Sequence, residues 1–341
     1  MTRRFVFVVL ALAAAWLAGV VVASGMGYIQ VAPAEVARVL AARLLGRPEW
    51  LAGLDRVVPL VVFDVRLPRI LCAALVGSGL ALAGVVYQGV LRNPLADPYT
   101  LGVSTGAAFG AAVALLGNID AVAVLSVPLF AFAGAVGVLA VVLWLASVDG
   151  RLHANTLILA GIVVGAILAA GISFLKYLAD EQVSVIIFWL MGSFASRSWI
   201  HVGVVLAAVL AGGAVIFAYG RDLDILALGD RSAESLGLDA AKVRRRLLVA
   251  ASLVAAVCVS VSGIIGFVGL IVPHLMRFVV GPDSRRLALV CLGGGGILLL
   301  AADTVSRAVL PREVPVGVLT ALLGGPFFCY LFRRRRGFRG L

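Results

Sequence analysis

The sequence predicts an all-α, polytopic membrane protein with ten transmembrane helices. Three observations support this: the composition, a series of charge-free runs, and an uneven distribution of basic residues. Of the 341 residues, 62% are hydrophobic and 13% are charged, whereas soluble proteins carry about 25% charged residues. A soluble domain of this length needs far more polar surface. The composition therefore excludes an ordinary soluble enzyme, a disordered chain and a disulfide scaffold.

Ten runs of 15 residues or more contain no Asp, Glu, Lys or Arg, and they cover 5–34, 70–91, 98–119, 121–148, 152–175, 182–196, 198–220, 247–276, 287–302 and 314–332. A helix that crosses a bilayer needs about 20 apolar residues. The run 182–196 is short, whereas 247–276 is long enough to turn at its glycines and cross twice. Either 182–196 lies at the surface and 247–276 forms two spans, or each forms one. Both topologies have ten spans and place the termini on one side.

The basic residues distinguish these two topologies. The first places 18 of the 28 Lys and Arg residues on the side of the termini, and the second places 13 there. Because cytoplasmic loops are enriched in Lys and Arg, the first is favoured. Both termini and the loop 221–246 are then cytoplasmic. The net charge of +11 divides into +10 inside and +1 outside, a pattern that orients the chain against anionic lipid and requires no nucleic-acid partner.

The sequence lacks the residues that coupled carriers and ATP-hydrolysing proteins usually need. No Asp, Glu or Lys lies in the middle of a predicted span, although proton-coupled carriers usually need one there. A phosphate-binding loop requires Ser or Thr after Gly-Lys, but Tyr177 follows Lys176 and Val243 follows Lys242. The four cysteines are dispersed and form no CxxC pair. We therefore expect no catalytic, cofactor-binding or metal-binding residue in this chain. If the chain drives transport, a partner must supply the energy.

Several stretches closely resemble the membrane permease of bacterial iron-chelate and cobalamin ABC importers, the FecCD-type transmembrane subunit. The long and specific ones are QGVLRNPLADP at 88–98 and GFVGLIVPH at 266–274. The others are LALGDRSAESLG at 226–237, ADTVSR at 302–307 and PVGVLTALLGGPFF at 315–328. The resemblance runs from about Arg66 to Phe332. It implies the fold of the cobalamin-importer permease, a type II ABC importer, with residues 1–341 forming a single transmembrane permease domain.

The resemblance also implies a set of partners. The family works as a homodimer in the bacterial inner membrane, with the pathway on the two-fold axis. A cytoplasmic ATPase dimer binds ATP and Mg, and a periplasmic or lipid-anchored substrate-binding protein delivers the cargo. The expected cargo is an iron chelate, either a siderophore or haem, and cobalamin is the alternative. A proton-coupled secondary transporter is the remaining, less favoured function.

The loop 221–246 is the expected cytoplasmic coupling element. Asp230 can cap a short helix and Gly237 can end it, but six or seven residues are too few for a stable isolated helix. The resemblance implies that this helix docks on the ATPase, with Leu236 and Leu238 in apolar contact. The alternative is a solvated connector. The residues expected to take part in coupling are Gly229, Asp230, Arg231, Ala233, Glu234, Leu236, Gly237 and Leu238.

Two further sites follow from the resemblance. Arg66, Arg69 and Arg307 lie at the outer ends of predicted spans, and the resemblance implies that Arg66 and Arg307 receive glutamates of the binding protein. The planar guanidinium suits a carboxylate, but such arginines can also anchor helix ends. Ala154 and Asn155 correspond to the cytoplasmic gate, and helix capping is the alternative role of Asn155.

Overall fold

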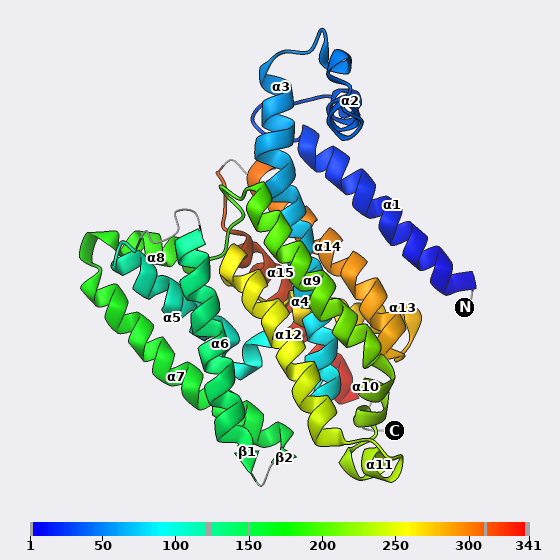
Figure 1. Cartoon of the computed structure of the whole chain (residues 1–341), viewed down its shortest axis with the longest axis vertical. Helices are drawn as coiled ribbons and strands as arrows, with labels where there is room; N and C mark the ends of the chain where they lie inside the picture. Colours follow the sequence, from blue (N-terminus) through cyan, green and yellow to red (C-terminus); the bar gives the residue numbers. More distant parts are fainter. Residues whose placement is uncertain (1–2, 120–124, 149–150, 310–311, 338–341) are drawn as a thin grey trace.

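The computed structural model describes residues 3–119, 125–148, 151–309 and 312–337. In these residues the chain is a bundle of packed helices (Figure 1), and the one exception is the two-stranded hairpin of β1 (Ser147–Val148) and β2 (Arg151–Leu152). The predicted all-α class is confirmed. Seven helices of the described residues are long and apolar enough to cross a membrane. They are α1 (Arg3–Gly25), the continuous helix Val57–Val90, α6 (Ser126–Ala146), α7 (Ala154–Leu178), α9 (Trp199–Ala218), α12 (Ala240–Ser262) and α14 (Ser284–Ala308).

Three shorter apolar helices complete the bundle: α5 (Val103–Leu116), α13 (Val268–Val280) and part of α15 (Val316–Gly337). Together with the seven long helices they occupy the ten positions predicted for spans. The crossing of the membrane by all ten stays a prediction. The run 182–196 holds only the short helix α8 (Val183–Leu190), and the long run 247–276 is divided between α12 and α13. The turn between them uses positive φ angles at Gly263 and Phe267.

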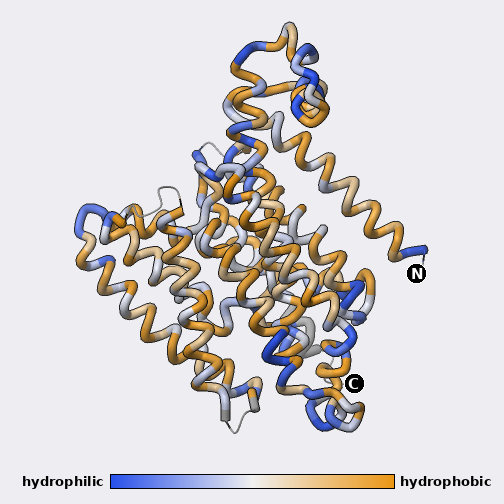
Figure 2. The backbone as a smooth tube through the Cα atoms, in the orientation of Figure 1, coloured by the Kyte–Doolittle hydropathy of each residue, from blue (hydrophilic) through white to orange (hydrophobic). Residues whose placement is uncertain are grey.

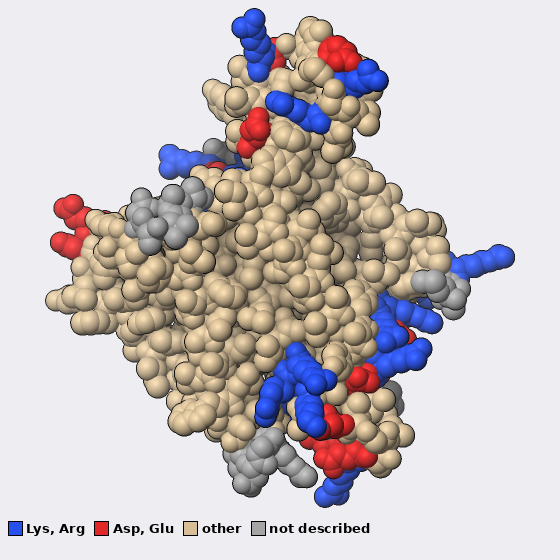
Figure 3. Space-filling model, viewed as in Figure 1, with Lys and Arg blue, Asp and Glu red and all other residues tan. Residues whose placement is uncertain are grey.

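The remaining elements lie at the two ends of the bundle. At one end α2 (Pro33–Leu44), the 3-10 turn η1 (Pro48–Leu51) and α3 (Val57–Leu60) form a small lobe. At the other end α10 (Gly220–Ala227) and α11 (Asp230–Ser235) lie near the C-terminus. Apolar residues dominate the helices between these ends (Figure 2), and the charged side chains in view gather mostly at the ends (Figure 3). The turns η3 (Pro98–Leu101) and η5 (Asp180–Gln182) join helices.

The core forms around α4 (Leu67–Val90), which follows α3 and the π-helical turn η2 (Val61–Arg66) in one continuous helix. Most of α4 is buried. Close helix packing depends on glycine, because a Cβ on Gly77 would lie 2.2 Å from the carbonyl oxygen of Gly295, and one on Gly84 would lie 2.0 Å from that of Gly269. Small residues let helices approach closely inside a membrane. These contacts hold α14 and α13 against α4.

Two of the stretches that carry the family resemblance meet in this core. The Gln88 side-chain amide donates to the carbonyl oxygens of Gly269 and Leu270, each at 3.2 Å. The Tyr99 hydroxyl donates to the carbonyl oxygen of Ile265. The Asp97 carboxylate accepts from the backbone N–H groups of η3 and so starts that turn. The stretches near residues 90 and 270 therefore form one structural unit.

Candidate functional site

The candidate coupling element is α11, a six-residue helix with glycines on both sides. Gly229 and Gly237 have φ angles of 105° and 79°, which glycine adopts without a steric penalty. The N–H of Gly237 donates to Glu234 O and that of Leu238 donates to Ala233 O, both at 3.0 Å. These two bonds form a Schellman motif, which satisfies the terminal carbonyls of a helix. The predicted end of the helix at Gly237 is confirmed.

Arg244 of α12 fixes α11 to the bundle. Its guanidinium donates to Asp230 Oδ1 at 2.5 Å and to the carbonyl oxygen of Leu152 at 2.7 Å, and its side chain is buried. The hydrogen bond from Arg244 holds the pKa of the Asp230 carboxyl below its usual value. The predicted capping role of Asp230 is wrong, because α11 has no side-chain cap and this carboxylate faces Arg244 instead. The arginine therefore ties α11, β2 and α12 together.

The side chains of α11 divide into an inner and an outer face. Ala233 is fully buried, and Leu238 packs against the main hydrophobic core. Leu236 is 63% exposed, and Arg231 and Glu234 are also exposed. Leu236 is therefore accessible for the expected apolar contact, whereas Leu238 faces inward, and the contact itself stays a prediction. Leu228, 67% exposed, is a second exposed leucine in this loop that the sequence analysis missed, although it lies within the LALGDRSAESLG stretch.

At the opposite end, Arg66 and Arg307 hold the C-terminal end of α1. Arg66 donates to Ser24 O at 2.9 Å and to Ile29 O at 2.6 Å. Arg307 donates to the carbonyl oxygens of Met26, at 2.6 Å, and Ala23. A cation at this end of a helix is favourable, because it pairs with unsatisfied carbonyls and the helix dipole. Arg66 and the side chain of Arg307 are each 8% exposed, so both arginines anchor a helix end and do not present their guanidiniums to solvent.

Arg69 occupies the centre of the same cluster. Its guanidinium binds Asp303 Oδ1 at 2.7 Å and Glu313 Oε1 at 2.6 Å. Asp303 also lies 3.4 Å from Arg307 Nε and is almost completely buried. The sequence analysis missed these two carboxylates, although Asp303 belongs to the ADTVSR stretch. Docking of a carboxylate on Arg66 or Arg307 stays a prediction, and it requires the arginine to leave the α1 carbonyls.

The expected gate residues lie at the start of α7, next to the β hairpin. Ala154 is partly buried and Asn155 is exposed. The N-cap of α7 is His153, and the helix has no side-chain cap, so the structure gives Asn155 no capping role. The Arg244–Leu152 bond places this corner beside α11. Within the described residues, no three His, Cys, Asp or Glu side chains form a group that could hold a metal ion.

Comparison with known proteins gives a consistent result. Residues 6–334 match the FecCD transport family. The chain is 44% identical to the cobalamin import system permease protein BtuC of Halobacterium salinarum, over 83% of this chain and 76% of that one. It is 38% identical to the hemin transport system permease protein HmuU of Yersinia pestis, over 80% of this chain and 83% of that one. The solved structure of an ABC transporter assigned to the metal-chelate type, in an inward-facing conformation, superposes on this chain with a TM-score of 0.82 at 32% identity. The superposition covers 96% of this chain and 98% of that one.

Proposed function

The chain belongs to the FecCD transport family and is a membrane permease subunit of an ABC importer, and from this premise we propose how it works. Two copies form the pathway on a two-fold axis in the bacterial inner membrane, with all termini cytoplasmic. An ATPase dimer binds at the α11 end and a substrate-binding protein at the α2 end. The chain itself binds no ATP, Mg or other cofactor and contributes no catalytic residue.

The observation that carries this proposal is the exposed face of α11. Leu228 and Leu236 lie in a loop with charged neighbours, and Arg244 holds the helix in place from behind. An apolar centre with a polar rim is typical of a protein–protein contact. Movement of the ATPase would thus reach α12 and the Ala154–Asn155 corner through Arg244. Loop 221–246 is the coupling element in this proposal.

Leu236→Asp tests the coupling assignment. A charge in the apolar centre should abolish co-purification with the ATPase and transport, while the unfolding midpoint of the permease stays unchanged. Leu45→Asp is the matched control, because Leu45 is 64% exposed at the opposite end of the molecule. Normal ATPase binding by Leu236→Asp would contradict the assignment.

Docking of the binding protein at the other end needs a separate test, because Arg66 and Arg307 already donate hydrogen bonds to backbone carbonyls of this chain. We expect Arg66→Glu/Arg307→Glu to weaken docking most at low salt, because the contact is electrostatic. Arg312→Glu is the control for an exposed arginine near this end. In the wild type, docking should also increase hydrogen exchange at residues 23–29. If the binding protein docks without a change in hydrogen exchange at residues 23–29, the docking role of Arg66 and Arg307 is contradicted and they act only as helix anchors.

The proposed cargo is an iron chelate, either a siderophore or haem, as the name of the hemin relative suggests. Cobalamin is the second candidate, because the relative at 44% identity is named a cobalamin permease. Proteoliposomes that contain the permease, its ATPase and its binding protein distinguish them when haem, a ferric siderophore and cobalamin are supplied in turn. Uptake without ATP would instead favour a proton-coupled carrier.

A further inference from the structure

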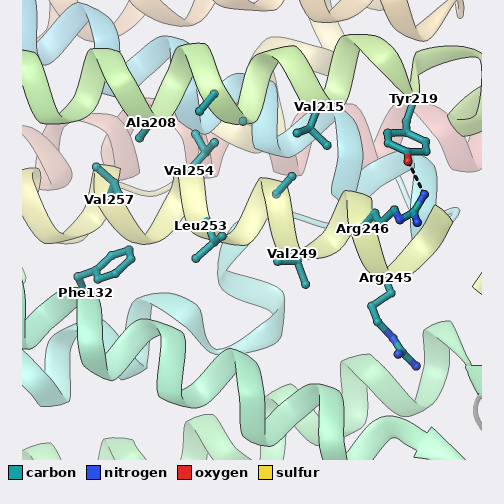
Figure 4. Close-up of a pocket in the computed structure, with 13 residues that line it drawn as sticks. Phe132, Ala208, Val215, Tyr219, Arg245, Arg246, Val249, Leu253, Val254 and Val257 are labelled. Atoms are coloured by element: carbon teal, nitrogen blue, oxygen red, sulfur yellow. Dashed lines mark hydrogen bonds between the residues drawn. The ribbon is translucent and has the colours of Figure 1, made fainter. Parts of the chain in front are cut away.

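An apolar groove runs along the side of the bundle between α9 and α12. It has a volume of about 700 Å³ and is lined almost entirely by small and aliphatic side chains, with Phe132 of α6 at one end and Arg245, Arg246 and Tyr219 at the other. Figure 4 shows the aliphatic side chains that α12 contributes to the groove, which are Val249, Leu253, Val254 and Val257. Neither α11 nor the outer arginine cluster lines this groove, although Arg245 and Arg246 belong to loop 221–246.

The three consecutive arginines at the start of α12 have different environments. Arg244 points inward to Asp230 and Leu152. Arg246 donates to the Tyr219 hydroxyl at 2.5 Å and lies 5.7 Å from the centre of its ring. Arg245 points the other way from Arg246 (Figure 4), is exposed, and has no hydrogen bond or ion pair with any described residue. Two exposed guanidiniums therefore flank one end of an apolar groove.

The nearby acidic side chains do not neutralise both guanidiniums. Asp239 binds Lys242 Nζ at 2.8 Å and caps α12, and its carboxylate also interacts electrostatically with Arg246. Asp224 accepts the backbone N–H of Ser284 at 3.0 Å, and Asp230 is bound to Arg244. The end of the groove therefore keeps a positive charge that is available to an anion. An apolar groove alone does not indicate a class of ligand. An apolar groove with a positively charged end indicates an amphipathic anion.

The dimensions match a lipid. From Arg245 to Val257 the α12 helix rises about 18 Å, at 1.5 Å per residue. One leaflet of a bilayer has a hydrocarbon depth of about 15 Å, half of the ~30 Å core. A lipid with one acyl chain along α12 would place its headgroup at the end of the groove that Arg245 and Arg246 flank. Basic pockets between helices on the cytoplasmic side suit anionic headgroups.

We propose that this groove binds an anionic phospholipid of the cytoplasmic leaflet, with its headgroup at the positively charged end that Arg245 and Arg246 flank and one acyl chain between α9 and α12. The choice of leaflet rests on the proposed topology, whereas the lipid preference does not. Because Arg244 joins the same helix to α11, the lipid would also steady the part of α12 that carries the coupling element.

Native mass spectrometry of the purified full chain tests the proposal, with dioleoyl phosphatidylglycerol and dioleoyl phosphatidylcholine as the probes. The wild type should retain phosphatidylglycerol more strongly. Each arginine removed should weaken this binding about fivefold, the equivalent of roughly 1 kcal/mol per basic residue. Arg245→Gln/Arg246→Gln should therefore bind phosphatidylcholine and phosphatidylglycerol alike. Lys242→Gln, one turn away on the same helix, is the control and should keep the preference.

A second variant tests the groove itself. Ala208→Phe places a ring in the apolar part and leaves both arginines in place, so it should lower retention of both lipids. Equal retention of the two lipids by the wild type would overturn the proposal. So would unchanged retention of phosphatidylglycerol in the double variant or in Ala208→Phe. Gel filtration and unfolding midpoints check that each variant is folded. Failure of the coupling assignment would instead appear in ATPase co-purification, which this experiment does not use.

Discussion

The two ends of the bundle both bury arginine, but for opposite purposes. At the end that carries α2, Arg66 and Arg307 bind the carbonyls at and just after the end of α1, and Arg69 joins α4 to Asp303 and Glu313. Each of these guanidiniums is bonded to groups of the chain itself. At the opposite end Arg244 binds the buried side of α11 and leaves the other side of that helix exposed. A buried arginine can therefore hold a helix end within the fold, as Arg66 and Arg307 do, or it can position a helix whose other side stays exposed, as Arg244 does.

The difference arises from what each arginine faces. The end of α1 carries carbonyls without intrahelical partners, which attract cations. In contrast, α11 is too short to be stable alone, so it depends on its Schellman motif and on the Asp230–Arg244 pair. Variants at the two ends should therefore differ in kind. Variants at the α1 end should alter mainly the global stability, whereas variants around α11 should alter coupling at a smaller or local cost in stability.

The largest expected effect is at Asp303. Asp303→Asn removes the buried carboxylate that faces Arg69 and Arg307, which leaves charge uncompensated in the interior. Removal of one partner of such a group costs about 3–5 kcal/mol. Chemical unfolding of the purified protein measures this loss. Glu313→Gln is the control, since Glu313 is exposed and should cost less than about 1 kcal/mol. Equal losses in both variants would show that burial of Asp303 carries no special cost.

An intermediate effect is expected at Gly237. Gly237→Pro removes the N–H that bonds Glu234 O and cannot adopt the φ angle of 79°. We expect a local loss of about 3 kcal/mol, seen as faster hydrogen exchange in residues 230–238, together with loss of ATPase co-purification. Gly53→Pro, at a φ of 83° in the outer lobe, should leave the coupling intact. Normal exchange in residues 230–238 of Gly237→Pro would refute the role of the motif.

The smallest effect is expected at Asp230. Asp230→Asn should cost about 1 kcal/mol, since its ion pair with Arg244 is partly exposed and screened by solvent. The folded-state pKa of Asp230 is lowered, so the ion pair contributes fully above the unfolded value of about 3.9. Its contribution disappears as the pH falls through the lower folded value.

The pH dependence of this variant is the measurement that checks the ion pair. The difference in unfolding free energy between wild type and Asp230→Asn should stay constant from pH 7 to about pH 5 and shrink below about pH 4. Asp239 offers a comparison, because its pKa is also lowered but its carboxylate is fully exposed. Asp239→Asn should have a smaller effect at every pH. A difference for Asp230→Asn that does not vary with pH would refute the ion pair.

The sequence by itself determined the class of the protein, the positions of the apolar helices, the division of 247–276 and the end of α11 at Gly237. These features depend on hydropathy and on turn residues, which act over a few neighbouring positions. The tertiary structure decided which partner each polar side chain takes. Arg307 meets a carbonyl 281 positions away, and Leu238 faces inward while Leu228 faces out. Such choices depend on which helices lie side by side, and no local pattern contains that information.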